Sequence, residues 1–109
     1  MTDLKSLQRR ILKNKKKQGF DTTNIDLQFL FIYGEITEAY EAWRKKKEDL
    51  NEELADIAIY VLGLAEMLGI DLGAEIDKKM TKNEKRKYKK INGVMTRVGG
   101  NTKSNGEEK

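Results

Sequence analysis

The sequence predicts an all-α fold, an up-and-down bundle of about four helices. Three observations predict it. The chain of 109 residues contains no proline, the residue that most strongly interrupts helices. It is rich in lysine, glutamate, leucine and alanine, which favour helix interiors. Apolar residues also recur at helical spacing along most of the chain. The length suits one compact domain.

The first helix is predicted from Thr2 to about Lys17, where apolar residues fall on one face and Gly19 follows as a C-cap. The segment FDTTN, residues 20–24, offers N-caps for a second helix over about residues 25–44. The apolar residues expected on the first helix are Leu4, Leu7, Ile11 and Leu12. Those expected to be buried on the second are Leu27, Leu30, Phe31, Ile36 and Ala39.

A third helix is predicted from about Asn51 to Leu68. Past Ala55 it is apolar almost all round, so we expect its own bundle or another subunit to enclose it. Gly69 ends it, and Asp71 caps a fourth helix over about residues 72–90. The inner side of that helix is predicted to carry Leu72, Ile76 and Met80. Residues 1–92 therefore form the predicted helical domain, and residues 93–109 a flexible polar tail.

Composition excludes several kinds of site. With no cysteine and no histidine, the chain has no thiolate chemistry and no imidazole base or ligand. Any metal must be held by oxygen atoms, which favours Mg²⁺, with Mn²⁺ able to substitute. The net charge of +4 suits an anionic partner, although lysine runs on helices are mostly solvated and nucleic acid is not the favoured partner. No apolar run approaches the roughly 18 residues of a membrane span, and a cytoplasmic location is expected.

Two pairs of acids form the most informative pattern. Glu35 and Glu38 are three residues apart on the second predicted helix, and Glu53 and Asp56 repeat that spacing on the third. An antiparallel turn centred between residues 45 and 46 brings the two pairs level. Four neighbouring carboxylates repel one another, and divalent cations resolve the conflict. The alternative is an ordinary solvated surface, but Asp56 leads directly into an apolar run, where an idle acid is unfavourable.

The residues YGEITEAYEAW, EELADIAIYVLGLAEMLGIDL and IDKKMTKNEKRKY resemble the MazG-like all-α nucleoside triphosphate pyrophosphohydrolases over roughly residues 25–90. The resemblance implies Mg²⁺-dependent hydrolysis of the bond between the α- and β-phosphates of a nucleoside triphosphate, giving monophosphate and pyrophosphate. It also implies a homo-oligomer, a dimer or tetramer, and suggests housecleaning of non-standard nucleotides.

Carried over by position, the resemblance implies that Glu35, Glu38, Glu53 and Asp56 bind the metal. It places Lys79, Asn83 and Arg86 at the polar positions of the third motif, and their spacing puts them on one helix face, suited to phosphates. A solvated lysine-rich face is the alternative for these three. Trp43 is a candidate for stacking on the base, with packing or an interface as its alternative.

The first motif departs from many relatives, which have a doubled acid where this chain has Ile32 and Tyr33. A register three residues earlier would place Ile32 at a ligand position. The register that uses Glu35 and Glu38 matches the Gly-Glu-x-x-Glu form of the family motif directly. Without histidine, proton removal falls to a carboxylate, with Glu38 or Glu41 as the catalytic candidate.

Two further hypotheses compete with a hydrolase. One is a non-catalytic basic helical module that binds nucleotide or nucleic acid through its lysines. The other is a family member that binds nucleotide or metal without turnover. Assays of pyrophosphate release with and without Mg²⁺ distinguish all three.

Overall fold

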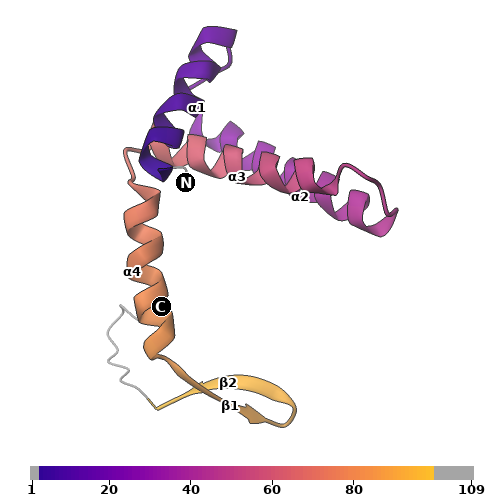
Figure 1. Ribbon diagram of the computed structural model, residues 1–109, viewed down its shortest axis with the longest axis vertical. Helices are drawn as coiled ribbons and strands as arrows, with labels where there is room; N and C mark the ends of the chain where they lie inside the picture. The colour runs from indigo at the N-terminus through magenta and orange to yellow at the C-terminus, as the bar shows by residue number, and fades with distance from the viewer. Residues whose placement is uncertain (1–2, 100–109) are drawn as a thin grey trace. The chain divides into compact units, whose positions relative to one another are not determined.

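The computed structural model describes residues 3–99. They form four helices and one antiparallel β-hairpin (Figure 1), so the predicted all-α class is confirmed with a small sheet added. The chain divides into two compact units, one ending at Gly73 and the other beginning at Ala74. The elements are α1 (Leu4–Gln18), α2 (Ile25–Arg44), α3 (Leu50–Met67), α4 (Leu72–Lys85), β1 (Lys87–Ile91) and β2 (Val94–Val98).

Local capping sets the limits of the first two helices. Asp3 accepts a hydrogen bond from the Ser6 backbone N–H at 3.2 Å, and Asn24 accepts one from Leu27 N–H at 3.0 Å. These contacts satisfy backbone donors that have no partner within the helix. Gly19 ends α1 with φ 86°, a left-handed conformation that glycine adopts without a steric penalty. The predicted caps at Gly19 and within residues 20–24 are therefore confirmed.

Helix α3 is the centre of the N-terminal unit. It packs against both α2 and α1, and Figure 1 shows α2 and α3 side by side with α1 crossing near one end. The buried apolar residues lie on the three helices of this unit, on α3 only towards its C-terminal end. They are Ile11, Ala39, Ala42, Leu62, Leu64 and Ala65.

The predicted buried side of α2 is largely wrong. Leu30, Phe31 and Ile36 are exposed, whereas Ala39 and Ala42 are buried. The small alanines allow α3 to approach closely, and of the larger residues Phe31 still meets α3 through an edge-on contact with the Tyr60 ring, whose centroid is 5.9 Å away. Helix α3 is likewise buried mainly at residues 62–65, and Leu54 and Ile59 are exposed. The unit thus leaves much apolar surface uncovered.

Gln8 fastens α1 to the segment after α3. Its side-chain amide donates to Ile70 O at 2.8 Å and to Glu66 Oε1 at 3.2 Å, and its oxygen accepts from Leu72 N–H at 3.0 Å. Gln8 is only 1% exposed, so these bonds replace the water that burial removes. This polar anchor fixes the position of α1 against α3.

The C-terminal unit differs from the prediction. Helix α4 ends at Lys85, not near Lys90, and in its own unit Ile76 and Met80 remain exposed rather than inner. Strand β1 pairs with β2 through the turn Asn92–Gly93, whose φ angles are 52° and 81°. Asn-Gly is the preferred two-residue hairpin turn, a signal that the prediction of a tail from residue 93 overlooked. Residues 100–109 of that predicted tail lie outside the described residues.

Within residues 3–99, no single helix has both the length and the apolar content needed to cross a bilayer. Helices α3 and α4 meet those two criteria only when counted together across the break between them.

Candidate metal centre

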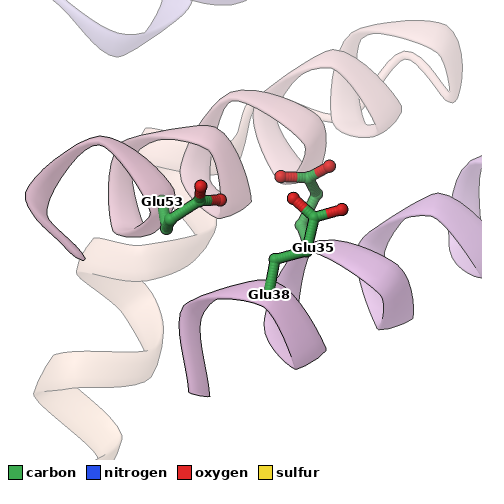
Figure 2. Close-up of side chains that lie close together, drawn as sticks. All are labelled: Glu35, Glu38 and Glu53. Atoms are coloured by element: carbon green, nitrogen blue, oxygen red, sulfur yellow. The ribbon is translucent and has the colours of Figure 1, made fainter. Parts of the chain in front are cut away.

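Carboxylates from α2 and α3 converge in the N-terminal unit. Glu35 and Glu38 project from α2, and Glu53 projects towards them from α3 (Figure 2). One carboxylate oxygen from each of the three lies within 4.8 Å of the others. The predicted antiparallel pairing of α2 and α3 therefore brings these three acids together.

The acids are partly withdrawn from solvent without compensation. Glu35 Oε1 and Glu53 Oε1 are shielded from solvent and have no hydrogen-bond partner among the described residues. Burial raises the pKa of Glu35, and the surrounding carboxylates, with Glu38 first, raise it further. Burial also raises the pKa of Glu53, followed by the charge of Glu38. Every charged group that shifts these two pKa values is a carboxylate, so the cluster is electrostatically unfavourable alone.

This donor set fits a hard divalent cation. Mg²⁺ and Mn²⁺ take carboxylate oxygens as ligands, and a bound cation would neutralise the repulsion and engage the two oxygens that lack hydrogen bonds. Asp56 lies outside the group of three, but its charge also raises the pKa of Glu35 and of Glu53. Asp56 therefore interacts electrostatically with the cluster, and its role as a metal ligand stays a prediction.

Glu41 lies apart from the acid cluster. Its carboxylate is 3.5 Å from Lys45 Nζ, one turn further along α2. This i,i+4 ion pair is partly exposed and contributes little to stability. Of the two candidates for the general base, Glu38 is the one that the structure places beside Glu35 and Glu53.

The three predicted phosphate contacts lie in the C-terminal unit. Lys79 and Asn83 are four residues apart on α4, whereas Arg86 lies just past the end of the helix. The turn continues there through a hydrogen bond from Arg86 N–H to Asn83 O at 3.1 Å. Asn83 Oδ1 is shielded from solvent and accepts no hydrogen bond from residues 3–99. Their role in substrate binding stays a prediction.

Trp43 is on the exposed side of α2 and is 63% exposed. Its ring stacks on Tyr40, with centroids 6.2 Å apart and an interplanar angle of 25°. The ring is accessible, and its predicted stacking on a base stays untested by this geometry.

Sequence reasoning missed Tyr60, which lies near the acids, and the two residues Lys15 and Gln28 that are connected to it. Lys15 on α1 donates to Gln28 Oε1 at 3.0 Å and lies 4.8 Å from the centroid of the Tyr60 ring. Burial raises the pKa of Tyr60, and Glu35, Asp56 and Glu38 raise it further, so its phenol lies in the field of the cluster. Tyr60 follows Asp56 by four residues, one helical turn, and this spacing could have pointed to it.

Comparison with known proteins agrees with this geometry. The model of the MazG-like family matches residues 25–99. A solved structure described as a cyanophage S-2L MazG-like pyrophosphohydrolase, bound to dGDP and three catalytic Mn²⁺ ions per active site, has 24% sequence identity with this chain and a TM-score of 0.71. The match covers 91% of this chain and 100% of that one. A search of curated proteins finds no match.

The family match spans α2, α3, α4 and the hairpin. It includes both acid pairs and the motif on α4, and the similar structure shares the fold. The chain therefore belongs to the MazG-like family.

Proposed function

We propose that this protein is a nucleoside triphosphate pyrophosphohydrolase that requires a divalent metal ion, Mg²⁺ or Mn²⁺. It adds water across the bond between the α- and β-phosphates, which gives a nucleoside monophosphate and pyrophosphate. The observation that carries the proposal is the acid cluster, in which Glu35, Glu38 and Glu53 approach within 4.8 Å with two shielded oxygens unpaired. Membership of the MazG-like family and the dGDP and Mn²⁺ in the similar structure support it.

The residues of the cluster have separate roles in this proposal. Glu35, Glu38, Glu53 and Asp56 hold the metal, which supplies positive charge that offsets the charge of the phosphates and of the leaving pyrophosphate. Glu38 takes the proton from the attacking water, with Glu41 as the alternative base. Phosphoryl transfer depends mainly on positioning and electrostatics, so the chain needs no nucleophilic side chain.

The test is an assay of the full chain with a panel of ribo- and deoxyribonucleoside triphosphates, including non-standard bases. We expect pyrophosphate release with Mg²⁺ or Mn²⁺ and none with EDTA. Release of orthophosphate instead would contradict cleavage between the α- and β-phosphates. Nucleotide binding without turnover would favour a binding module, the competing hypothesis. The relative rates would show whether the enzyme prefers non-standard nucleotides.

A second copy of the chain is proposed to cover the apolar side of α2. Five large apolar residues on that helix are 48–66% exposed, at alternating spacings of four and three residues, as in coiled-coil seams. A seam of this kind is unfavourable in water and suits a dimer or tetramer. Light scattering on the purified chain tests it, and a monomer at micromolar concentration would contradict it. The residues are Phe29, Tyr33, Ile36, Tyr40 and Trp43.

A further inference from the structure

A cavity of about 1040 Å³ lies in the N-terminal unit, among α1, residues 19–21, α2 and α3. Its wall includes the aromatic rings of Phe20, Phe31 and Tyr60, and it reaches Asp56 at the acid cluster. Its wall combines apolar side chains such as Ile11 and Ile59 with charged ones such as Arg10, and its size is typical of small-molecule sites. The cavity is thus large enough for a nucleoside whose phosphates lie at the carboxylates.

Lys15 is a cationic group of this wall that neighbouring side chains hold in place. Its ammonium donates to Gln28 Oε1 at 3.0 Å and lies over the Tyr60 ring. Gln28 is 1% exposed, and its own amide donates to Asp21 O at 3.3 Å. That second bond fixes the orientation of the amide, so its oxygen faces the lysine. By contrast, Lys13 and Lys17 line the same cavity but are exposed.

Gly63 makes room for the lysine stem. A Cβ atom at this position would lie 3.1 Å from Ile11 Cγ2 and 3.3 Å from Lys15 Cε, closer than most contacts in folded proteins. The absence of a side chain on α3 therefore lets α1 approach and lets the Lys15 stem pass across α3. The position of the ammonium is a product of packing and not of a free surface side chain.

The surroundings of Lys15 and of the acid cluster differ. Burial lowers the pKa of Lys15 and is the cause of that shift, whereas three carboxylates of the cluster raise the pKa of Tyr60. Tyr60 thus joins the two, with its phenol in the field of the acids and its ring under the ammonium. An ammonium carries three N–H donors and no acceptor. Gln28 Oε1 accepts one of them, so the ammonium retains two N–H donors for a ligand.

We propose that Lys15 determines base specificity by donating a hydrogen bond to a carbonyl oxygen of the nucleobase. Hypoxanthine, guanine and the pyrimidines carry such an oxygen. Adenine carries an amino group, itself a donor, at the corresponding position and is disfavoured. A site built around a donor rejects an analogue without the acceptor because its buried polar group is then left unpaired. The inference rests on the proposed function, since it assigns the cavity to the nucleoside of the same substrate.

The experiment compares dITP with dATP, which differ at position 6 of the purine, an oxygen against an amino group. We expect the wild-type enzyme to favour dITP in kcat/KM by about ten-fold or more. Lys15→Met should bring the ratio close to one by slowing dITP hydrolysis, and Lys15→Arg should keep part of the preference. Lys16→Met, on the same helix but exposed and outside the cavity wall, is the matched control with an unchanged ratio. Circular dichroism checks folding. Lys15→Met alone leaves the Gln28 oxygen buried without its donor. The double variant Lys15→Met, Gln28→Met removes that oxygen as well.

Three results would overturn the inference. They are a wild-type ratio near one, a ratio unchanged in Lys15→Met, or an equal loss for both nucleotides, which would place Lys15 on the phosphates. Equilibrium binding of the α,β-imido analogues of dITP and dATP measures the same preference without turnover. If no triphosphate is hydrolysed, the proposed function fails, while the binding ratio still decides the role of Lys15.

Discussion

Two sets of polar groups shielded from solvent in the N-terminal unit differ in whether they have hydrogen-bond partners. The amides of Gln8 and Gln28, each 1% exposed, find partners at both their nitrogen and their oxygen. The shielded oxygens of Glu35 and Glu53 find none, and their neighbours carry the same charge. Gln8 joins α1 to the end of α3, Gln28 joins α2 to α1, and the glutamates lie between α2 and α3.

The difference separates structural from functional polarity. A buried group with all its bonds made stabilises the fold or is neutral to it, whereas a buried group without partners destabilises it. The glutamine amides therefore hold α1 in place. The glutamates reduce the stability of the metal-free protein, and we interpret that unfavourable arrangement as a site prepared for a cation. The predictions below test this difference by changing the glutamates or the glutamines.

The largest effect is expected from Glu53→Gln, which removes one charge and keeps the shape. Pyrophosphate release should fall by at least about 100-fold because the metal loses a ligand. The melting temperature in EDTA should rise because repulsion among the carboxylates decreases. Glu52→Gln, at the neighbouring exposed position, is the control and should change neither quantity. A variant of Glu53 with full activity would refute the metal assignment.

The opposite pattern is expected from Gln8→Leu. Loss of the amide leaves Ile70 O and Leu72 N–H without their partner, which should lower the free energy of unfolding by about 2–4 kcal/mol. Urea unfolding measures it, with the exposed Gln18→Leu as control, expected within about 0.5 kcal/mol of wild type. Activity per folded molecule should remain. If the two variants were equally stable, Gln8 would not be an anchor.

The smallest effect is expected from pH. Because folding raises the pKa of Glu35 and Glu53 above 4.5, the metal-free folded state binds more protons than the unfolded state between that value and the raised pKa values. Their contribution to stability therefore falls as pH rises through this window. In EDTA from pH 4.5 to 7, we expect wild type to lose a few degrees of melting temperature relative to Glu53→Gln.

Metal should reverse that dependence. Ionised carboxylates bind the cation, so stabilisation by saturating Mn²⁺ should grow with pH over the same window. If the melting temperatures of wild type and Glu53→Gln in EDTA changed with pH in parallel, these carboxylates would not repel one another in the folded state.

Much of the fold could be predicted because its signals are local. The caps at Gly19 and Asn24 and the positions of the four helices follow from residues within a few positions of each other. Asn92–Gly93 carried an equally local signal for the hairpin, but the glycine-rich, polar composition after it, without a periodic pattern, led to the prediction of a tail. No local signal predicted which side of α2 is buried, because that depends on how α2 is rotated about its axis relative to α3.

In the candidate site, too, local spacing predicted some residues and not others. The i,i+3 spacing of Glu35 and Glu38, repeated at Glu53 and Asp56, together with a short turn, was enough to predict an acid cluster. No spacing predicted that Lys15, thirteen residues before Gln28 and forty-five before Tyr60, would contact both.

The sequence by itself determined the helices, the pairing of α2 with α3 and the meeting of their acids, because periodicity and turn length act over short stretches of chain. Only the tertiary structure decided which oxygens lose water without gaining a partner, and where Lys15 stands in the cavity. Those outcomes depend on how closely helices approach, as at Gly63, where a side chain would crowd Ile11 and Lys15 of α1.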